Sequence, residues 1–561
     1  MPPLTQSQLG IYIDSLRHDD RSIYHTPFLS RMPEGTDAQQ LAAAVRSVIA
    51  AYPSMSARIV SDCDGNPSLA DFSASQPLQV DITDMSEEEL DASKDSLVQP
   101  FGLDGGPLAH ISVIKTEKHV YLFTDFHHTV FDGYSRRLML QEIDKAYRGI
   151  EPQPERLTIF DVASEEAEAR KSPEYTAAHD RYAEIINGAD TAFDIIPDTA
   201  GPTEETYVET SFTIDIDSDG YKKYCRNADM PQSVPATSAM GIVLQTYSRK
   251  DDVTFATIYH GRKADLHDRT FGMMVKTLPI RINTDADTTT GQLLSVTKDR
   301  LKSVRDNDIY SFADAAQEYG VNSDFLFAYQ GAFLDTPTVN GGNIESIPLK
   351  KLSTGAKITS SLLLTQGKMT LTIEYRSDLY TPQTISGMAS CFESVLSALM
   401  HSDSDMAVSH LPLMSAVAQE RIISLGQGAP SRADNDATIP MLFKKAASIH
   451  SDNTSIVYKD RRLTYRELDA LTDALAVMLR DKYNVSSGTT VGVLIERSEL
   501  MAIYPLAIMK AGGAYMPLDP HFPTDRLMFM IEDASLSLIL ADDGLAEQTI
   551  PQFEGNVISA S

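Results

Sequence analysis

Residues 126–133 read Phe-His-His-Thr-Val-Phe-Asp-Gly, and they join an apolar segment to a helical pattern. The segment before them, His119 to Phe126, has the length and composition of a buried strand. After Gly133 the apolar residues Met139 and Ile143 recur at helical spacing, so a helix is expected to follow the glycine. Strand, loop and helix in this order are typical of mixed α/β layers.

The loop between this strand and this helix has the chemistry of a reaction site. A histidine at the end of a strand can project into a cleft, and a neutral imidazole accepts a proton near neutral pH. The adjacent Gly133 lets a substrate approach the backbone closely. A single histidine on a strand is more often a satisfied core residue, but the complete string favours the reaction site.

Strand and helix patterns continue to alternate along the chain. Helices are expected at Asp37 to Ala50, Ser164 to Gly188, Val234 to Ser248, Gly291 to Asn307 and Pro382 to Met400. Further strands are expected at Ile111 to Ile114, Tyr207 to Ile216, Val253 to Ile258, Met274 to Ile282 and Met369 to Tyr375.

The pattern changes near residue 412, and a second unit follows. Gly426 to Asp436 is rich in Gly, Pro, Ser, Asn and Asp, which is typical of a linker. Thr464 and Glu467 then form a capping box that opens a helix. The buried face of that helix is expected to hold Leu468, Leu471, Leu475 and Leu479. A β-α-β unit and a last strand are expected at Val491 to Ile495, Glu499 to Lys510, Ala514 to Leu518 and Leu536 to Ala541.

The composition narrows the classes of partner. The formal net charge is −30, which argues against nucleic acids and anionic membranes as partners, because both are bound by clustered Lys and Arg. The N-terminus has no basic segment followed by an apolar run, and no apolar stretch is long enough to span a membrane. Cys63, Cys225 and Cys391 lie far apart without metal-ligand spacing, so we expect reduced core thiols in a cytoplasmic protein.

The central string resembles the HHxxxDG signature of the condensation domains of nonribosomal peptide synthetases. Other segments resemble further motifs of that family, and the resemblance covers residues 1–415. These segments are Leu4 to Tyr12 for its opening motif, Tyr259 to Arg262 and Phe271 to Arg281 for its GR…GxFVNTLPLR motif, and Ser323 to Gln330 for a late strand.

The C-terminal part resembles the start of an adenylation domain. Leu463 to Leu468 is similar to LTYxEL, and Met509 to Pro520 is similar to LKAGxAYVPLDP. The sequence does not contain the Gly/Ser/Thr-rich phosphate loop of that family. We therefore expect this fragment neither to bind ATP nor to activate an amino acid by itself.

The resemblance implies the fold class α/β (α+β). It implies two chloramphenicol-acetyltransferase-like lobes in a V, with the active site in a tunnel between them, and a truncated α/β adenylation subdomain. The expected division is a condensation N-lobe at 1–175, a C-lobe at 176–412, a linker at 413–437 and an adenylation fragment at 438–561.

The resemblance also implies roles for the residues of the string. His128 would position or deprotonate the α-amine of the acceptor, and the Gly133 backbone N–H would stabilise the oxyanion. His127 belongs to the same catalytic motif, but it is expected to support the site rather than to take part in the reaction. Asp132 is expected to be structural and to pair with Arg262 at the junction of the lobes. No metal ligands and no bound cofactor are expected.

The function implied is amide (peptide) bond formation between a donor acyl or peptidyl thioester and the amine of an acceptor aminoacyl thioester. Both substrates would be carried on the 4'-phosphopantetheine of partner carrier proteins, and ATP would serve only a complete adenylation domain. No nucleic acid or membrane partner is expected. Because the condensation motifs start at the first residues, the donor is expected on a separate carrier or as a starter acyl group.

Some positions depart from the family pattern. Ser56 stands where the family has a structural arginine, and Arg58 follows just beyond it. Lys276 replaces the asparagine of the Val-Asn-Thr motif, which places a cation near the expected acceptor side. These changes bear on the support of the core and on the substrates that fit, but they leave the central string intact.

Other functions remain as alternatives. A cyclising domain would replace the histidines by an aspartate motif, and an epimerising domain would normally follow a carrier domain. A stand-alone acyltransferase is disfavoured by the adenylation-like tail. A catalytically silent docking platform for carrier proteins is disfavoured by the intact His128, Asp132 and Gly133.

Overall fold

The computed structural model describes residues 1–17, 23–191, 195–199, 205–263, 266–331, 338–349, 356–365, 367–428 and 437–559. It divides into two compact units, Met1–Ser424 and Leu425–Ser561. Each unit is mixed α/β. The expected linker at 413–437 includes residues 429–436, which lie outside the described residues, and its first part contains the helix α12 (Ala416–Gly426).

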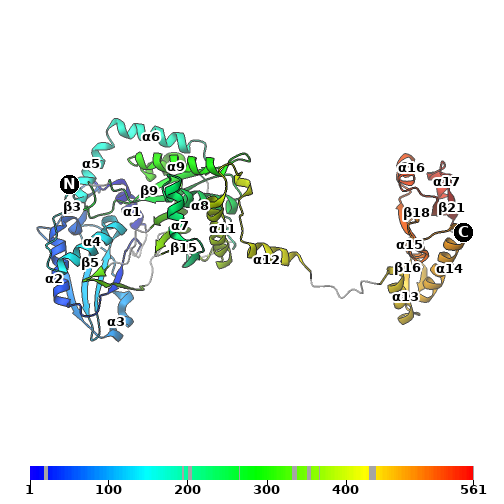
Figure 1. Ribbon diagram of the computed structural model, residues 1–561, viewed down its shortest axis with the longest axis horizontal. Helices are drawn as coiled ribbons and strands as arrows, with labels where there is room; N and C mark the ends of the chain where they lie inside the picture. The colour runs from blue at the N-terminus through cyan, green and yellow to red at the C-terminus, as the bar shows by residue number, and fades with distance from the viewer. Residues whose placement is uncertain are drawn as a thin grey trace. The chain divides into compact units, whose positions relative to one another are not determined.

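The first lobe of unit 1 is built on a five-stranded sheet with the order β13-β1-β6-β5-β4. β4 and β5 run parallel, whereas the other neighbours are antiparallel. The helices α2 (Ala38–Ala51) and α4 (Gly133–Tyr147) pack together beside this sheet (Figure 1). The strands are β1 (Phe28–Arg31), β4 (Val80–Asp84), β5 (Ala109–Lys115), β6 (Val120–Phe126) and β13 (Glu345–Ile347).

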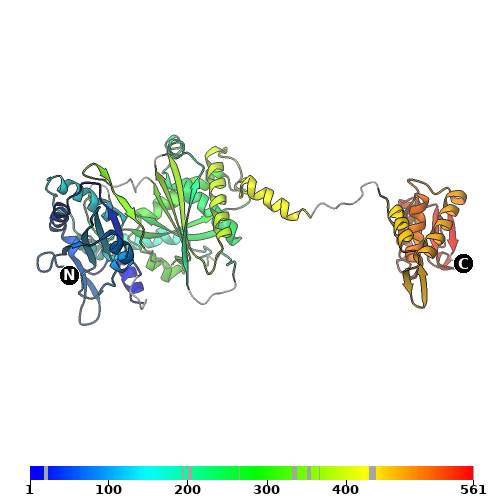
Figure 2. The ribbon, with the colours of Figure 1, turned by 90° about the horizontal axis from the view of Figure 1, so that it is seen from below.

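The second lobe of unit 1 is built on a six-stranded sheet with the order β7-β15-β14-β10-β8-β9. The helices α8 (Ser233–Ser248), α9 (Thr290–Asp306) and α11 (Pro382–His401) pack around it, and the sheet is seen almost edge-on in Figure 2. Its strands are β7 (Tyr207–Ile214), β8 (Asp252–Tyr259), β9 (Lys276–Asn283), β10 (Phe325–Gly331), β14 (Ile358–Thr365) and β15 (Lys368–Arg376).

The chain returns from the second lobe to the first. β13 pairs antiparallel with β1, and Val339 and Ile344 are buried in the core of the first lobe. Residues 338–347 therefore pack with the lobe expected at 1–175, although they belong by sequence to the range 176–412. No periodic pattern marks so short a strand, so sequence periodicity cannot reveal this crossing.

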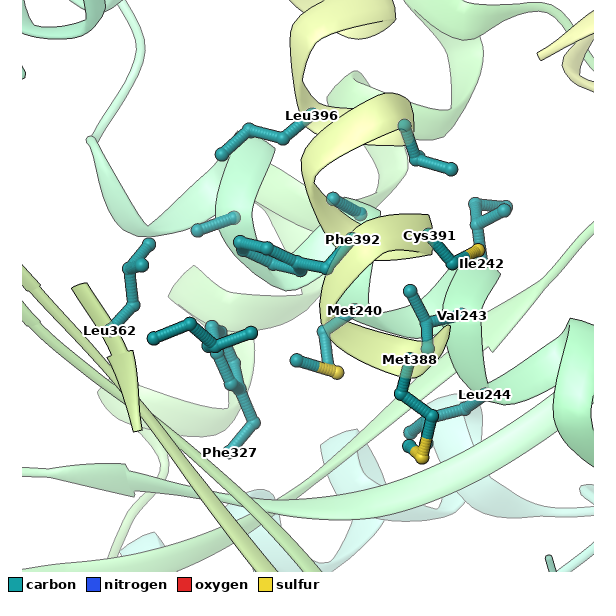
Figure 3. Close-up of a cluster of buried hydrophobic side chains, with 14 of the residues drawn as sticks. Met240, Ile242, Val243, Leu244, Phe327, Leu362, Met388, Cys391, Phe392 and Leu396 are labelled. Carbon is teal, nitrogen blue, oxygen red and sulfur yellow. The ribbon is translucent and has the colours of Figure 1, made fainter. Parts of the chain in front are cut away.

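The core of the second lobe forms where α8 and α11 pack on the sheet. Figure 3 shows Phe392 and Met240 from these helices facing Phe327 and Leu362 of the strands. The helix α8 lies unusually close to β9 at Gly241. A Cβ at this position would stand only 2.6 Å from the Ile282 side chain of β9, so the absence of a side chain permits the close approach. This packing fixes β8 and β9, whose ends lead to the candidate site.

One predicted helix is wrong as a single element. The segment Ser164 to Gly188 forms parts of two helices, α5 (Ile159–Ala169) and α6 (Pro173–Ile186). Ser172 caps the second helix through the Glu174 N–H, and Pro173 occupies its first position. A proline has no N–H to continue the preceding helix, and this places the break before it.

The second unit contains a four-stranded parallel sheet with the order β19-β18-β20-β21. The expected helices and strands of the β-α-β unit are present, and β21 is a further strand beyond the last one expected. Leu471 is 47% exposed, so its expected place on the buried face is wrong, whereas Leu468 and Leu479 are buried. The elements are β18 (Thr490–Leu494), β19 (Ala514–Leu518), β20 (Leu538–Ala541), β21 (Asn556–Ser559), α14 (Tyr465–Tyr483) and α15 (Leu500–Ala511).

The remaining elements are short or peripheral. In unit 1 they are α1 (Gln6–Ser15), η1 (Pro53–Ser56), β2 (Ala57–Ser61), β3 (Pro67–Asp71), α3 (Glu87–Ser93), η2 (Lys94–Leu97), η3 (His128–Val130), α7 (Ser218–Asn227), α10 (Phe312–Tyr319), β11 (Thr338–Val339), β12 (Gly342–Asn343) and η4 (Val408–His410). In unit 2 they are α13 (Ile439–Ile449), β16 (Thr454–Tyr458), β17 (Arg461–Thr464), α16 (Thr524–Asp533) and α17 (Leu545–Thr549).

The three cysteines carry free thiols, but they are not all core residues. Cys225 and Cys391 are buried, whereas Cys63 is exposed, which corrects the expectation for that residue. Within the described ranges, no helix combines the length and the apolar character needed to cross a membrane. The same residues hold no cluster of three or more His, Cys, Asp or Glu side chains suited to a metal ion.

The core of the second lobe gives a first prediction. Phe392→Ala removes a fully buried ring, and we expect it to lower the free energy of unfolding of unit 1 by about 3–5 kcal/mol. Urea unfolding followed by circular dichroism measures this loss. Ser394→Ala, at a half-buried position of the same helix, is the matched control, and an equal loss in both variants would contradict the assigned core.

Candidate active site

The loop that carries the two histidines begins where β6 ends. The backbone N–H of His128 donates to the Tyr24 carbonyl at 2.8 Å, and Val130 N–H donates to the His127 carbonyl at 3.0 Å. The short helix η3 follows at His128–Val130. The position of His128 is therefore fixed from the neighbouring segment as well as from its own strand.

The imidazole of His128 has a defined orientation. Its Nδ1 lies 2.6 Å from the Phe131 carbonyl oxygen. A carbonyl oxygen can only accept a hydrogen bond, so Nδ1 carries the proton and donates. In the neutral ring the lone pair is then on Nε2, and the side chain is half-buried rather than enclosed. The geometry provides a ring nitrogen that is able to accept a proton.

The neighbouring His127 is in a different environment. It is fully buried, and its Nδ1 accepts from the Thr129 N–H at 3.3 Å. Its Nε2 lies 3.2 Å from the Ser15 hydroxyl, which donates onward to the Ile11 carbonyl. Burial, and then the charges of His25 and His128, lower the pKa of His127 to about 3. A neutral ring with both nitrogens occupied is suited to holding the loop.

Asp132 ends the loop and begins α4. Its Oδ1 accepts from the Ser135 N–H at 2.8 Å, which makes Asp132 the N-cap of the helix. Its Oδ2 lies 2.7 Å from Arg262 Nη1, and its Oδ1 lies 3.1 Å from Arg262 Nη2. Oδ2 also accepts from the Met274 N–H at 3.1 Å. The structure thus brings Asp132 and Arg262 together across the junction of the two sheets.

The ion pair between Asp132 and Arg262 is buried, and the positive charge of Arg262 stabilises the ionised form of Asp132. The side chains of Arg262 and Asp132 are 3% and 0% exposed. Burial alone raises the pKa of Asp132, but the Arg262 charge and the hydrogen bonds outweigh it and hold the pKa below its usual value. Arg262 also donates to the Gly272 carbonyl at 3.1 Å and lies over the Tyr134 ring.

Gly133 is the first residue of α4 and is exposed. The backbone N–H of a first helical residue has no acceptor within the helix, and it lies at the positive end of the helix dipole. The space into which a Cβ would project is open, with nothing within 4 Å. A donor at this position of a helix can serve an acceptor outside the helix.

Two contributors to the junction were missed from the sequence. The Ser135 hydroxyl donates to Asp132 at 2.9 Å and accepts from the Gly272 N–H at 2.9 Å, so it joins both lobes. Its position three residues after a capping Asp is the signal that could have found it. Glu155 accepts from the Phe271 N–H at 2.7 Å, and burial raises its pKa to about 7. No local pattern marks Glu155.

The residues that depart from the family pattern have their own partners. Lys276 lies 3.2 Å from Glu166 and 3.5 Å from Asp308, so its charge is neutralised at the junction. Arg58 donates to the Gly105 carbonyl at 3.0 Å rather than to a core carboxylate. The Ser56 hydroxyl accepts from the Leu78 N–H at 3.0 Å and serves a local backbone contact.

Comparison with protein families assigns both units. Residues 1–423 match the family model described as condensation domain. Residues 443–559 match the model described as AMP-binding enzyme. The first match covers the histidine loop, Arg262 and the five- and six-stranded sheets of unit 1.

Curated relatives match along almost the whole chain. Bacitracin synthase 3 of Bacillus licheniformis is 25% identical over 569 residues, which cover 99% of this chain and 9% of the relative. Surfactin synthase subunit 1 of Bacillus subtilis (strain 168) is 23% identical, with 99% of this chain and 16% of the relative covered. The chain thus spans a small part of the length of these relatives.

Solved structures share the fold. A four-domain nonribosomal peptide synthetase bound to AMP and glycine matches with a TM-score of 0.70 and 19% identity, covering 100% of this chain and 44% of that one. The condensation domain of the monacolin K polyketide synthase matches with a TM-score of 0.62 and 15% identity, covering 72% and 98%. With a family model matched over residues 1–423, the chain belongs to the condensation-domain family, and it continues into an AMP-binding enzyme segment.

Proposed function

We propose that unit 1 forms an amide bond between a donor acyl or peptidyl thioester and the amine of an acceptor aminoacyl thioester. The observation that carries this proposal is the His128 ring, whose Nδ1 donates to the Phe131 carbonyl and leaves Nε2 as the accepting nitrogen. Membership of the condensation-domain family and the AMP-binding segment that follows it support the same reaction.

The reaction forms one C–N bond and breaks one C–S bond. The acceptor amine attacks the thioester carbonyl of the donor, and the tetrahedral intermediate then expels the donor thiolate. His128 Nε2 hydrogen-bonds the attacking amine, takes its proton as the C–N bond forms and returns it to the leaving thiolate. A thioester is a reactive acyl donor, so holding the two substrates together supplies much of the rate.

The oxyanion of the intermediate needs a hydrogen-bond donor. The Gly133 N–H is suited to this role because it lies at the N-terminus of α4, and the space beside the Gly133 Cα is open to a substrate. Asp132 and Arg262 stay out of the chemistry in this proposal. Both are buried and paired, and they fix the start of α4 on which Gly133 lies.

The substrates require partner proteins. We propose that donor and acceptor arrive on the 4'-phosphopantetheine of two carrier proteins and enter a tunnel between the lobes. ATP would be used only by a complete adenylation domain, of which the AMP-binding segment is the first part. The division into lobes 1–175 and 176–412, a linker at 413–437 and a fragment at 438–561 is part of this proposal. Free cysteines agree with a reducing compartment, the cytoplasm.

His128 gives the central prediction of the proposal. We expect His128→Ala to lower the rate of amide formation about 100- to 10,000-fold, because it removes the nitrogen that accepts the proton. The rate is measured by mass spectrometry with a panel of acyl and aminoacyl groups loaded on phosphopantetheinyl carriers.

His119→Ala is the matched control for this experiment. His119 lies in the turn at the other end of β6, and its ring contacts Tyr121 only edge-on. The rate of amide formation by His119→Ala is expected to stay at the wild-type level. An undiminished rate in His128→Ala would refute the role of His128, and no product from the wild type with any donor would favour a docking platform.

The ion pair gives a prediction about stability. Asp132→Asn keeps an oxygen for the Ser135 N–H but leaves the buried Arg262 charge unpaired, and we expect unit 1 to lose about 3–5 kcal/mol of its free energy of unfolding. Urea titration measures the loss. Glu168→Gln, which breaks an exposed pair with Lys171, is expected to have little effect. Equal stability of both variants would contradict the structural role of Asp132.

The buried ring of His127 gives a prediction about pH. Its pKa falls from 6.5 to about 3 on folding, so the unfolded chain binds this proton more readily than the folded one. The stability that this provides is complete above about pH 6.5 and is lost as the pH falls from about 6.5 to about 3.

Unfolding measured across this pH window tests the assignment of His127. In His127→Asn, which has no titrating ring, the decline in stability is expected to be shallower than in the wild type. His410→Asn changes an exposed histidine and is the control. If both variants follow the wild-type slope, His127 does not titrate as the structure indicates.

A further inference from the structure

A second histidine–carboxylate pair lies behind the candidate site. The Nδ1 of His25 is 2.7 Å from Asp125 Oδ2, and both side chains are 0% exposed. Asp125 is the next-to-last residue of β6, and His25 precedes β1. The reaction proposed above uses neither residue.

The surroundings of this pair are costly for polar groups. The His25 ring stacks on Phe101 with 4.4 Å between ring centroids, and Phe101 also contacts the His127 ring edge-on. Among the described residues, the buried His25 Nε2 and Asp125 Oδ1 have no hydrogen-bond partner. A buried polar pair left partly unsatisfied contributes little net stability, so its presence calls for another explanation.

The backbone beside the pair provides that explanation. Tyr24, the residue before His25, has φ of 66°, in the left-handed region that a bulky side chain seldom adopts. The carbonyl of Tyr24 accepts from the His128 N–H at 2.8 Å. A strained residue persists only where its surroundings hold it, and such residues cluster at functional sites.

The segment Tyr24 to Thr26 is joined to the end of β6 on both sides of His25. His25 and His127 form an isolated antiparallel bridge, and the Thr26 N–H donates to the Phe126 carbonyl at 2.9 Å. Two side-chain hydrogen bonds tie this segment to the same strand: the Thr26 hydroxyl donates to the Phe126 carbonyl at 2.7 Å, and His25 pairs with Asp125. The His25–Asp125 hydrogen bond therefore acts on the residue whose carbonyl holds His128.

We propose that His25 and Asp125 are positioning residues for His128. Their hydrogen bond keeps Tyr24 in its left-handed conformation, so that the Tyr24 carbonyl holds the His128 N–H and the imidazole keeps Nδ1 on Phe131. The catalytic consequence rests on the role of His128 proposed above, whereas the effect on its ring orientation does not.

The first measurement needs no substrate. The full chain is labelled with 15N-histidine, and the ring resonances of His128 are assigned by their absence from His128→Ala. In the wild type we expect a protonated Nδ1 and an unprotonated Nε2. In His25→Ala the loop loses its anchor, and we expect the His128 ring to populate both neutral tautomers.

The second measurement is the rate of amide formation with carrier-bound acyl and aminoacyl probes. We expect His25→Ala to lower kcat about 10- to 100-fold with KM unchanged, because misplacing a catalytic group affects the transition state and not carrier binding. His25→Asn offers an N–H to Asp125 from a similar position, and it is expected to recover most of kcat and the wild-type tautomer.

His110→Ala is the matched control. The His110 ring also packs on Phe101, with 4.8 Å between the ring centroids, and His110 is paired with Asp125 in the register of β5 and β6. Among the described residues, no hydrogen bond joins His110 to the segment Tyr24 to Thr26. Its kcat and its His128 resonances are expected to match the wild type.

The outcomes separate the two proposals. Wild-type resonances of His128 in His25→Ala, or an equal change in His110→Ala, would overturn the positioning role. Full activity of His128→Ala would overturn the proposed function, and the tautomer measurement would still decide whether His25 orients the ring.

Discussion

The site depends on one buried ion pair between two sheets. Asp132 caps α4 in the first lobe, and Arg262 reaches it from the segment that follows β8 in the second lobe. A buried pair of this kind contributes little net stability over an apolar contact, but it is strict in geometry because each lone pair must meet a donor. Five hydrogen bonds on one carboxylate therefore fix where the helix starts, and with it the Gly133 N–H.

Much of the local structure could be predicted from the sequence, because its causes are local. The capping box at Thr464 and the apolar spacing after Gly133 each mark a helix that the structure contains. The Ser172-Pro173 step also marks a helix start, but the expectation of one long helix ignored it. Leu471 shows the limit of spacing alone, since a leucine at helical register can still face solvent.

Contacts between distant segments were predictable only where a motif named both partners. Asp132 and Arg262 lie in two family motifs, so their pairing could be expected, and the structure contains it. The return of β13 to the first sheet has no such signal, because three residues carry no periodicity and the partner strand is distant in sequence. The same reason hides His25 and Asp125, which meet only because β6 and the segment before β1 are neighbours.

His127 and His128 show how burial divides identical side chains between two roles. Enclosure lowers the pKa of His127 and commits both of its nitrogens to the protein, so its ring can only hold the loop. One residue later the chain turns into η3, and among the described residues His128 uses a single ring nitrogen, Nδ1, in its hydrogen bond to the Phe131 carbonyl. A ring with no protein contact would be free to choose its tautomer, whereas a ring with two contacts could not receive a proton. The single hydrogen bond of His128 fixes its tautomer and still leaves Nε2 able to receive a proton. The buried His127 beside it holds the loop in place.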